Sequence, residues 1–446
     1  MLLKLHTNIF VVGLLTFGFM AVMVTAKSFS LMTLASLVGF VTQMALLSYF
    51  SHEDKADYSE RALILTVFIY TLLLGFFYIM LSEYYDGDNF LFSKADAMYY
   101  FKQCMKVREL GLIGNLSRII SDIDYDDWGA LVFDTIVMYI VPDKLFLNLI
   151  YTLIGCLSAL FLFRIGKSYM PDSYAFLAVL GYSCSSYMVF FNCSFLKESL
   201  FVYFVIAALY YQNCAIQSKS NKYLYLLVLN VVMIFFFRPA VAAFVAASSF
   251  VYYGITQKGK AISLFLYVGA IGAFIVSLKT IQEILEFNTA GGDLDAVIEE
   301  TNNGAYSGGF NYFVSLFGAF FGPFPSLFPK IQGPSYLEFL GAGLVYKLFL
   351  VGPFWYGIWM IWKNKVIELI PIVLFVLLEL VLTGAVCASL ELRKVLLHVP
   401  FMYIIAFYGL YKGFVPDSLT RISSFACYAF AIGVLFLWNV IKADNL

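Results

Sequence analysis

The sequence predicts an all-α polytopic integral membrane protein. Of its 446 residues, 62% are hydrophobic and only 13% are charged, and the mean hydropathy is +0.84. Soluble domains are about half apolar and about a quarter charged, so this composition excludes a soluble globular domain. Apolar runs of about 18–22 residues, the length that crosses a bilayer, recur along the chain. The net charge of −1 gives no electrostatic reason to expect a nucleic-acid partner.

About 13 of these runs are predicted to be transmembrane helices of a single membrane domain, residues 1–446. The first run resembles a signal peptide, but more spans follow it and Ala26 lacks a convincing cleavage context. We therefore expect it to be retained. The predicted spans are residues 8–26, 29–50, 62–82, 144–163, 174–192, 198–215, 223–237, 240–257, 261–280, 341–362, 366–390, 395–412 and 422–440.

The basic residues of the short connections predict the orientation. One side collects thirteen lysines and arginines and the other six, so the positive-inside rule places the N-terminus in the cytoplasm. Five charges at the opposite, extracytoplasmic face stand between or against apolar runs, where charge is rarely kept without a function. Because four of the five are basic, they predict a site for an anionic ligand. They are Lys197, Glu198, Arg238, Arg393 and Lys394.

Two segments on the extracytoplasmic side, residues 83–143 and 281–340, are too long to be simple connectors. The first contains a helical stretch at Ala95–Leu110, an acidic turn, and an apolar piece at 129–141. The second begins polar and becomes aromatic, with three prolines and several glycines. Such a broken backbone predicts a re-entrant or interfacial element rather than a full span.

The helix of the first loop carries polar and aromatic residues along one face. Asp96, Tyr99, Tyr100 and Gln103 follow the i, i+3, i+4, i+7 spacing that aligns side chains. Basic residues on the same helix suit contact with lipid headgroups. One interpretation is a capped amphipathic surface helix. The other makes Asp96 a general base or a metal-binding carboxylate at the membrane surface.

An acidic run follows in the same loop, with Asp122, Asp124, Asp126 and Asp127. Its oxygen ligands suit a divalent cation, but it lacks the glycine turn and distal glutamate of an EF-hand. We favour a solvated acidic loop, assign no metal site and expect no cofactor, with a divalent cation as the alternative. The seven cysteines have no paired spacing and predict neither a disulfide framework nor a metal cluster.

Lys197 and Glu198 stand at the extracytoplasmic end of a predicted hairpin, and as neighbours they point toward different partners. Without a function, the lysine would snorkel to water and the glutamate would interact with the helix dipole. Arg238 precedes Pro239 in a second tight hairpin. Its planar fork of donors matches phosphate oxygens, whereas the alternative is an anchor for the turn.

A late hairpin carries Glu391, Arg393, Lys394 and His398. A lone histidine is more often a packed residue than a catalyst, so His398 is the weaker member. Together the cationic hairpins lie where the phosphate of a lipid lies, and the aromatic second loop offers platforms for sugar rings and a prenyl chain. The pattern predicts a site for a phosphate-bearing lipid.

Three segments carry a resemblance to a known family. Ala95-Asp96-Ala97-Met98-Tyr99-Tyr100, the apolar stretch ending in Phe161-Leu162-Phe163-Arg164, and Phe195-Leu196-Lys197-Glu198-Ser199-Leu200 resemble bacterial envelope glycosyltransferases of the GT-C superfamily. The late Leu392-Arg393-Lys394 and His398-Val399-Pro400 resemble the closing basic-to-proline segment of that group. The layout, with two long outer loops, looks most like Wzy-type polysaccharide polymerases. One departure is that Asp96 follows the third span, whereas the family's acidic residue follows the first.

The resemblance implies a glycosyltransferase of the bacterial cytoplasmic membrane with an extracytoplasmic active site. It would polymerise polyprenyl-diphosphate-linked repeat units, with a chain-length regulator protein as a partner. The diphosphate would contact Lys197, Arg238 and Arg393, with Lys394, His398, Tyr99 and Tyr100 also in the substrate site. The catalytic base would be Asp96 or Glu198.

Three alternatives are weighed against the polymerase. The first is a GT-C transferase that adds one sugar from a polyprenyl-monophosphate donor. The second is a lipid-linked oligosaccharide flippase or transporter. The scarcity of charged residues at the centres of the predicted spans counts against it, with Lys347 and Glu379 as the nearest exceptions. The third is an envelope acyltransferase, for which no histidine–aspartate pair is placed at one face.

Overall fold

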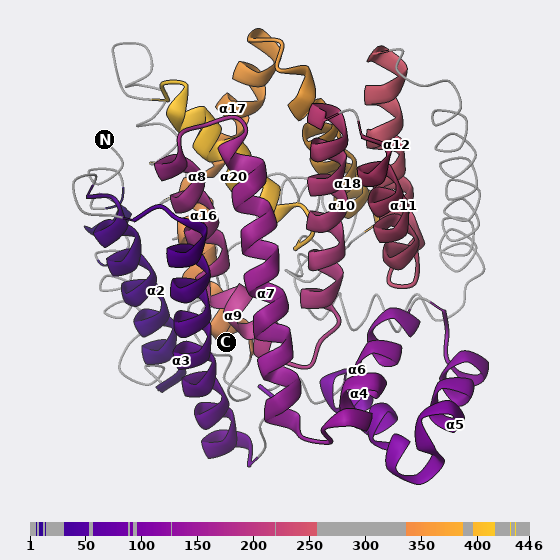
Figure 1. Ribbon diagram of the computed structural model, residues 1–446. Helices are drawn as coiled ribbons and strands as arrows, with labels where there is room; N and C mark the ends of the chain where they lie inside the picture. Colours follow the sequence, from indigo (N-terminus) through magenta and orange to yellow (C-terminus); the bar gives the residue numbers. More distant parts are fainter. Residues whose placement is uncertain are drawn as a thin grey trace, which may run out of the picture.

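The computed structural model places helices along nearly all of the chain that it describes (Figure 1). The description covers residues 31–52, 57–87, 90–91, 96–125, 127–218, 220–256, 336–386 and 396–414, with isolated positions near both termini. The predicted spans 261–280 and 422–440, most of 8–26 and almost all of the second long loop lie outside these residues. So do Arg393 and Lys394.

Most of the remaining predicted spans correspond to helices whose ends lie within a few residues of the expected ones. The helices of the first half are α2 (Leu31–Phe50), α3 (Glu60–Asp86), α4 (Asp96–Met105), α5 (Val107–Asp122), α6 (Trp128–Ile140), α7 (Lys144–Lys167), α8 (Asp172–Ser183) and α9 (Ser186–Cys193). Those of the second half are α10 (Glu198–Ser218), α11 (Asn221–Phe235), α12 (Pro239–Thr256), α16 (Tyr336–Phe349), α17 (Val351–Lys363), the 3₁₀ turn η1 (Ile367–Leu369), α18 (Ile370–Val386) and α20 (Val399–Tyr411).

Three of the described helices are long and apolar enough to cross a membrane alone: Glu60–Tyr85, Lys144–Lys167 and Glu198–Ser218. Two bent pairs raise the number to five if each pair is one span. The polytopic helical architecture is therefore supported, whereas the expected count of 13 spans is not confirmed.

Both bends fall inside a span that the sequence predicts as continuous. The predicted span 174–192 is divided into α8 and α9, which meet at 56°, and 341–362 is divided into α16 and α17, which meet at 46°. Pro353 in the first turn of α17 cannot donate a backbone hydrogen bond into α16, which explains the second break. At the first break, the Ser185 hydroxyl donates to the Tyr182 carbonyl at 2.6 Å, so a side chain competes with the helix.

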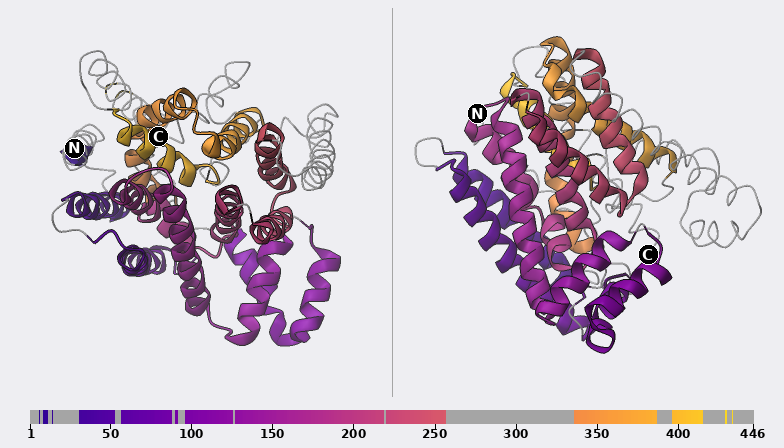
Figure 2. Two further views of the ribbon diagram at one scale, coloured as in Figure 1. Left: turned by 45° about the horizontal axis from the view of Figure 1, so that its top comes forward. Right: turned by 45° about the vertical axis from the view of Figure 1, so that its right-hand side comes forward.

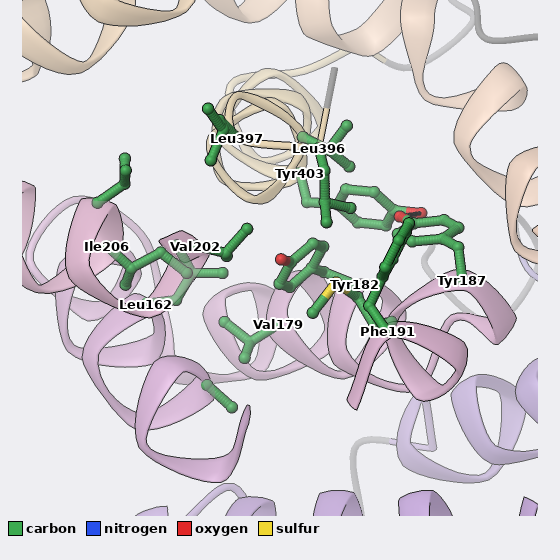
Figure 3. Close-up of a cluster of buried hydrophobic side chains, with 14 of the residues drawn as sticks. Leu162, Val179, Tyr182, Tyr187, Phe191, Val202, Ile206, Leu396, Leu397 and Tyr403 are labelled. Carbon is green, nitrogen blue, oxygen red and sulfur yellow. Dashed lines mark hydrogen bonds between the residues drawn. The ribbon is translucent and has the colours of Figure 1, made fainter. Parts of the chain in front are cut away.

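The interior of the bundle is closed by aromatic side chains. Tyr182 and Tyr187 from the α8–α9 pair face Tyr403 of α20 (Figure 3), and the hydroxyls of Tyr187 and Tyr403 lie 3.1 Å apart. His6 is fully buried nearby, with ring nitrogens 2.6 Å from the Ser51 hydroxyl and 3.0 Å from the Tyr346 hydroxyl. These contacts join the start of the chain to its second half.

The helices α4, α5 and α6 form a separate layer, here called the loop layer, at one end of the bundle beside the first turns of α7 (Figures 1 and 2). The helical stretch predicted at Ala95–Leu110 is divided between α4 and α5, α5 continues to Asp122 beyond the predicted end, and the apolar piece at 129–141 corresponds to α6. Arg118 fastens α5 to α4 by donating to the Gln103 carbonyl at 3.3 Å, and Arg108 donates to the Pro142 carbonyl at 2.9 Å. We call this end of the bundle the loop end.

The helices α7 and α10 are parallel but out of register. The Phe161 ring of α7, 17 residues past Lys144, stacks on Tyr203 and Tyr210 of α10, which are 5 and 12 residues past Glu198. At 1.5 Å per residue, Glu198 therefore starts about 12 Å deeper than the first residue of α7. The polar start of α10 is recessed behind the loop layer, and does not reach the end of the bundle as the sequence suggested.

The packing of α17 on α20 generates a stability prediction. A Cβ atom on Gly409 would lie 2.3 Å from the Pro353 carbonyl oxygen. Because backbone atoms on both sides must move, we expect Gly409→Ala to destabilise the protein by about 1–3 kcal/mol. The measurement is the thermal unfolding midpoint in detergent.

Gly114 is the matched control. It is exposed on α5, and an added Cβ there meets only the side chain of its own helix, at 3.3 Å. Gly114→Ala should be neutral or slightly stabilising, since alanine favours a helix. An unchanged midpoint for Gly409→Ala would contradict this packing.

Candidate functional site

A part-buried ion pair joins the loop layer to the bundle. Asp127, just before α6, accepts a hydrogen bond from the Tyr100 hydroxyl of α4 at 2.8 Å and pairs with the Lys197 ammonium at the start of α10. The side chains of Lys197 and Asp127 are only 11% and 25% exposed. Charge pairs at this burial interact more strongly than surface pairs, because water screens them less. This contact anchors the site, and Asp127 is not the solvated residue that the acidic run predicts.

The backbone around Asp127 is fixed by the α11–α12 hairpin. The Gly129 N–H donates to the Phe236 carbonyl at 3.0 Å, and the Trp128 and Phe236 rings stack 6.0 Å apart. Glycine is required here, because a Cβ at position 129 would lie 2.3 Å from the Phe237 ring. The hairpin that carries Arg238 is thereby held against the start of α6.

Both predicted catalytic carboxylates lie near the Tyr100 phenol. Burial and the Asp127 carboxylate raise the pKa of Tyr100, and the charges of Glu198 and Asp96 raise it further. Glu198 is 2% exposed, whereas Asp96 is half-buried at the start of α4. The structure therefore brings Asp96, Tyr100, Asp127, Lys197 and Glu198 together; with Arg238 we call them the loop-end site.

Arg238 completes the site from the hairpin side. Its guanidinium carbon lies 5.7 Å from the centre of the Phe201 ring, one helical turn beyond Lys197 on α10. Phe201 in turn stacks on Phe237 at 5.4 Å. In the described part of the chain no carboxylate lies within ion-pair distance of Arg238, although Glu379 interacts with it electrostatically.

Arginine at the other end of the bundle is bound differently. The Arg164 guanidinium donates both to Glu60 Oε1 at 2.9 Å and to Glu60 Oε2 at 2.8 Å. A bidentate carboxylate satisfies the planar fork there. No such bidentate carboxylate contacts Arg238 among the described residues, and its role in binding an anion stays a prediction.

Three other predicted residues have different positions. Tyr99 is 42% exposed, because it turns to the surface of α4 while Tyr100 turns inward. His398 is fully buried at the start of α20 near the charged Lys347 of α16, and among the described residues neither of its ring nitrogens has a hydrogen-bond partner. None of the contacts seen among the described residues joins His398 to Lys197 or Arg238. The places of Arg393 and Lys394 lie outside the described residues.

The described members of the acidic run point in different directions. Asp122 ends α5 and is exposed, with its carboxylate 2.6 Å from the Ser121 hydroxyl, while Asp127 turns inward. No group of three histidine, cysteine, aspartate or glutamate residues that could hold a metal ion occurs in the portion that the structure describes. The choice between no cofactor and a divalent cation stays a prediction.

Sequence reasoning missed a second acid beside the site. Asp134 of α6 is 2% exposed and accepts a hydrogen bond from the Tyr151 hydroxyl of α7 at 2.8 Å. Burial raises the pKa of Asp134 to about 7, and the Tyr151 hydrogen bond lowers it in part. Its signal was a single carboxylate inside the apolar piece 129–141, the same kind of signal that singled out Lys197 and Arg238.

Comparison with known proteins gives one match. Residues 127–286 match the Alg9-like mannosyltransferase family, over about a third of the chain. The matched segment starts at Asp127 and contains Asp134, Lys197, Glu198 and Arg238. No curated protein matches the chain.

Asp134 predicts a pH dependence of stability. Its folded-state pKa of about 7 lies above the unfolded value of about 3.9. Its contribution to stability is therefore complete below pH 4 and is lost as the pH rises through 7, by about 2 kcal/mol between pH 5 and 7. Asp134→Asn should flatten this part of the pH profile of the unfolding midpoint.

Tyr151→Phe should change the pH profile of the unfolding midpoint in the opposite direction from Asp134→Asn. It removes the hydrogen bond that lowers the pKa of Asp134, so the loss of stability should extend to higher pH. Tyr139→Phe, at a 57% exposed position on α6, is the control and should leave the profile unchanged. Identical profiles for the wild type and Asp134→Asn would exclude the assigned ionisation.

Proposed function

We propose that this chain is a membrane glycosyltransferase of the GT-C superfamily that takes a sugar from a polyprenyl-phosphate-linked donor. We place the reaction at the outer face of the bacterial cytoplasmic membrane, with the loop end outward. The similarity to a mannosyltransferase family supports a sugar-transferring enzyme. The observation that supports the proposal is the pair of cations at the start of α10 in an apolar bundle: Lys197, paired with Asp127, and Arg238, whose guanidinium lies 5.7 Å from the Phe201 ring one helical turn further along.

The proposed reaction breaks the bond between the anomeric carbon of the sugar and a phosphate oxygen of the donor. Negative charge then develops on the departing phosphate, which must be stabilised in the transition state. Arg238 has the donors for two phosphate oxygens, and Lys197 supplies a second positive charge. Because Asp127 neutralises part of the charge of Lys197, Arg238 is expected to contribute most.

The acceptor hydroxyl forms the new bond to the anomeric carbon and gives its proton to a carboxylate. Glu198 and Asp96 are the two candidates, since both lie near Tyr100. Asp127 is already bound by Lys197 and Tyr100, so we assign it a positioning role. Substitution of Glu198 by Gln and of Asp96 by Asn would identify the base, since only the base variant should lose the chemical step.

The product distinguishes two forms of the proposal. The first is polymerisation of diphosphate-linked repeat units, which the two long loops and the cationic hairpins favour. The second is addition of one sugar from a monophosphate donor, which the similarity to a mannosyltransferase family favours. Both need the same phosphate contact, so the residues of the loop-end site serve either one.

The first functional prediction concerns Arg238. Arg238→Ala should lower kcat/KM for sugar transfer about 100-fold or more, the usual effect of removing one transition-state donor. Arg238→Lys should recover only part of this, since lysine lacks the planar fork. Lys222→Ala, at an exposed position at the other end of α11, is the control. Wild-type transfer by normally expressed Arg238→Ala would contradict the proposal.

The second functional prediction concerns the glycan that cells make when the gene is deleted. If the protein is a polymerase, the deletion strain should carry surface glycan of a single repeat instead of a ladder of chain lengths. If the protein is a single-sugar transferase, the deletion strain should keep the ladder, and every repeat should differ in mass from the wild-type repeat by the same amount. Gel electrophoresis and mass spectrometry of the glycan separate these outcomes. A strain with an unaltered glycan would exclude both.

A further inference from the structure

The turn before Lys197 has a conformation that its residues disfavour. Phe195, in this turn, has a φ of +56° and is 2% exposed, and Leu91, which follows Phe90 in the segment after α3, has a φ of +51° and is fully buried. The left-handed region is unfavourable for residues with a Cβ, and it persists only where surrounding contacts hold it. Contacts around this turn must therefore stabilise its conformation.

Three phenyl rings and one ammonium group meet at this turn. The Lys144 ammonium lies 3.1 Å from the centre of the Phe90 ring, 5.2 Å from that of Phe195 and 5.6 Å from that of Phe101. The rings contact one another edge to face, with centres 5.6–6.0 Å apart. Cations are attracted to ring faces, and edge-to-face pairs are favourable. We call this group the Lys144 cage.

The cage joins four segments that are distant in the sequence. Phe90 follows α3, Phe101 lies on α4, Lys144 opens α7, and Phe195 precedes α10. Two of its members are close to site residues in the chain: Phe101 follows Tyr100, and Phe195 is two residues before Lys197. The cage therefore supports both halves of the Tyr100–Asp127–Lys197 contact.

The position of Lys144 indicates that its charge has a role beyond its own helix. It is the first residue of α7, where the helix dipole disfavours a positive charge. It is also half-buried, so its ammonium loses part of its hydration. A lysine at this position needs a compensating interaction, and the three rings supply one.

We propose that Lys144 is a positioning residue of the loop-end site. Its ammonium holds Phe90, Phe101 and Phe195 together, which maintains the left-handed turn at Phe195 and sets the direction from which Lys197 and Glu198 enter the site. The role in substrate binding rests on the proposed function, whereas the hold on the turn does not.

The test compares Lys144→Met, which keeps the length of the side chain without its charge, with Lys144→Arg, which keeps the cation. Lys102→Met, at an exposed position on α4, is the control. Two quantities are measured on the full-length protein in lipid nanodiscs. They are the hydrogen-exchange rate of residues 194–198 and the Kd of a probe, farnesyl diphosphate.

Lys144→Met should raise the exchange rate about tenfold, because the turn opens more often, and should weaken probe binding about tenfold. Lys144→Arg should lie within about threefold of the wild type for both. An unchanged exchange rate overturns the hold on the turn. Faster exchange with an unchanged Kd overturns the positioning role. A wild-type protein that fails to bind the probe overturns the proposed function, while the exchange rates still decide whether the cage holds the turn.

Discussion

The arrangement at the loop end depends on the contact between Asp127 and Lys197. It joins the loop layer to the start of α10 across 70 residues of sequence, and Tyr100 adds a third segment. Breaking such a pair removes a partner from the mostly buried Lys197 ammonium, which is unfavourable. The loop layer is therefore confined to positions in which Asp127 faces α10. Gly129 and Phe237 confine it from the hairpin side. The geometry around Tyr100 and Arg238 follows from these two restraints.

Much of the bundle could be predicted because apolar runs near 20 residues have one interpretation in a membrane protein. The ends of α2, α7, α10, α11 and α12 follow the predicted spans within a few residues. The break between α8 and α9 could not be predicted, since it depends on Ser185 bonding back to Tyr182. The depth of Glu198 relative to the first residue of α7 could not be predicted either, because it depends on the axial offset between α10 and α7. Hydropathy contains no information about register between helices.

The candidate site also contains residues that could be predicted from the sequence and residues that could not. Lys197, Glu198 and Arg238 were predicted because charge between apolar runs is conspicuous. In the structure Arg238 contacts Phe201, one helical turn beyond Lys197 on α10. Asp127 looked like one member of a solvated acidic run, and only the fold reveals its partner. The opposite holds for His398, which the sequence grouped with the surface cations and which is buried beside Lys347. The site is partly shielded from water, so each of its charges interacts more strongly with its partners than it would at the surface. The same shielding would strengthen the binding of a phosphate by Arg238.

The central claim is that Arg238 binds the phosphate of a polyprenyl-linked substrate. It is tested most directly by equilibrium binding of a long-chain polyprenyl diphosphate to the purified protein in nanodiscs, compared among wild type, Arg238→Ala and Lys222→Ala. We expect Arg238→Ala to bind at least about tenfold more weakly, equivalent to about 1.4 kcal/mol, and Lys222→Ala to bind like the wild type. Equal affinity in all three proteins would contradict it.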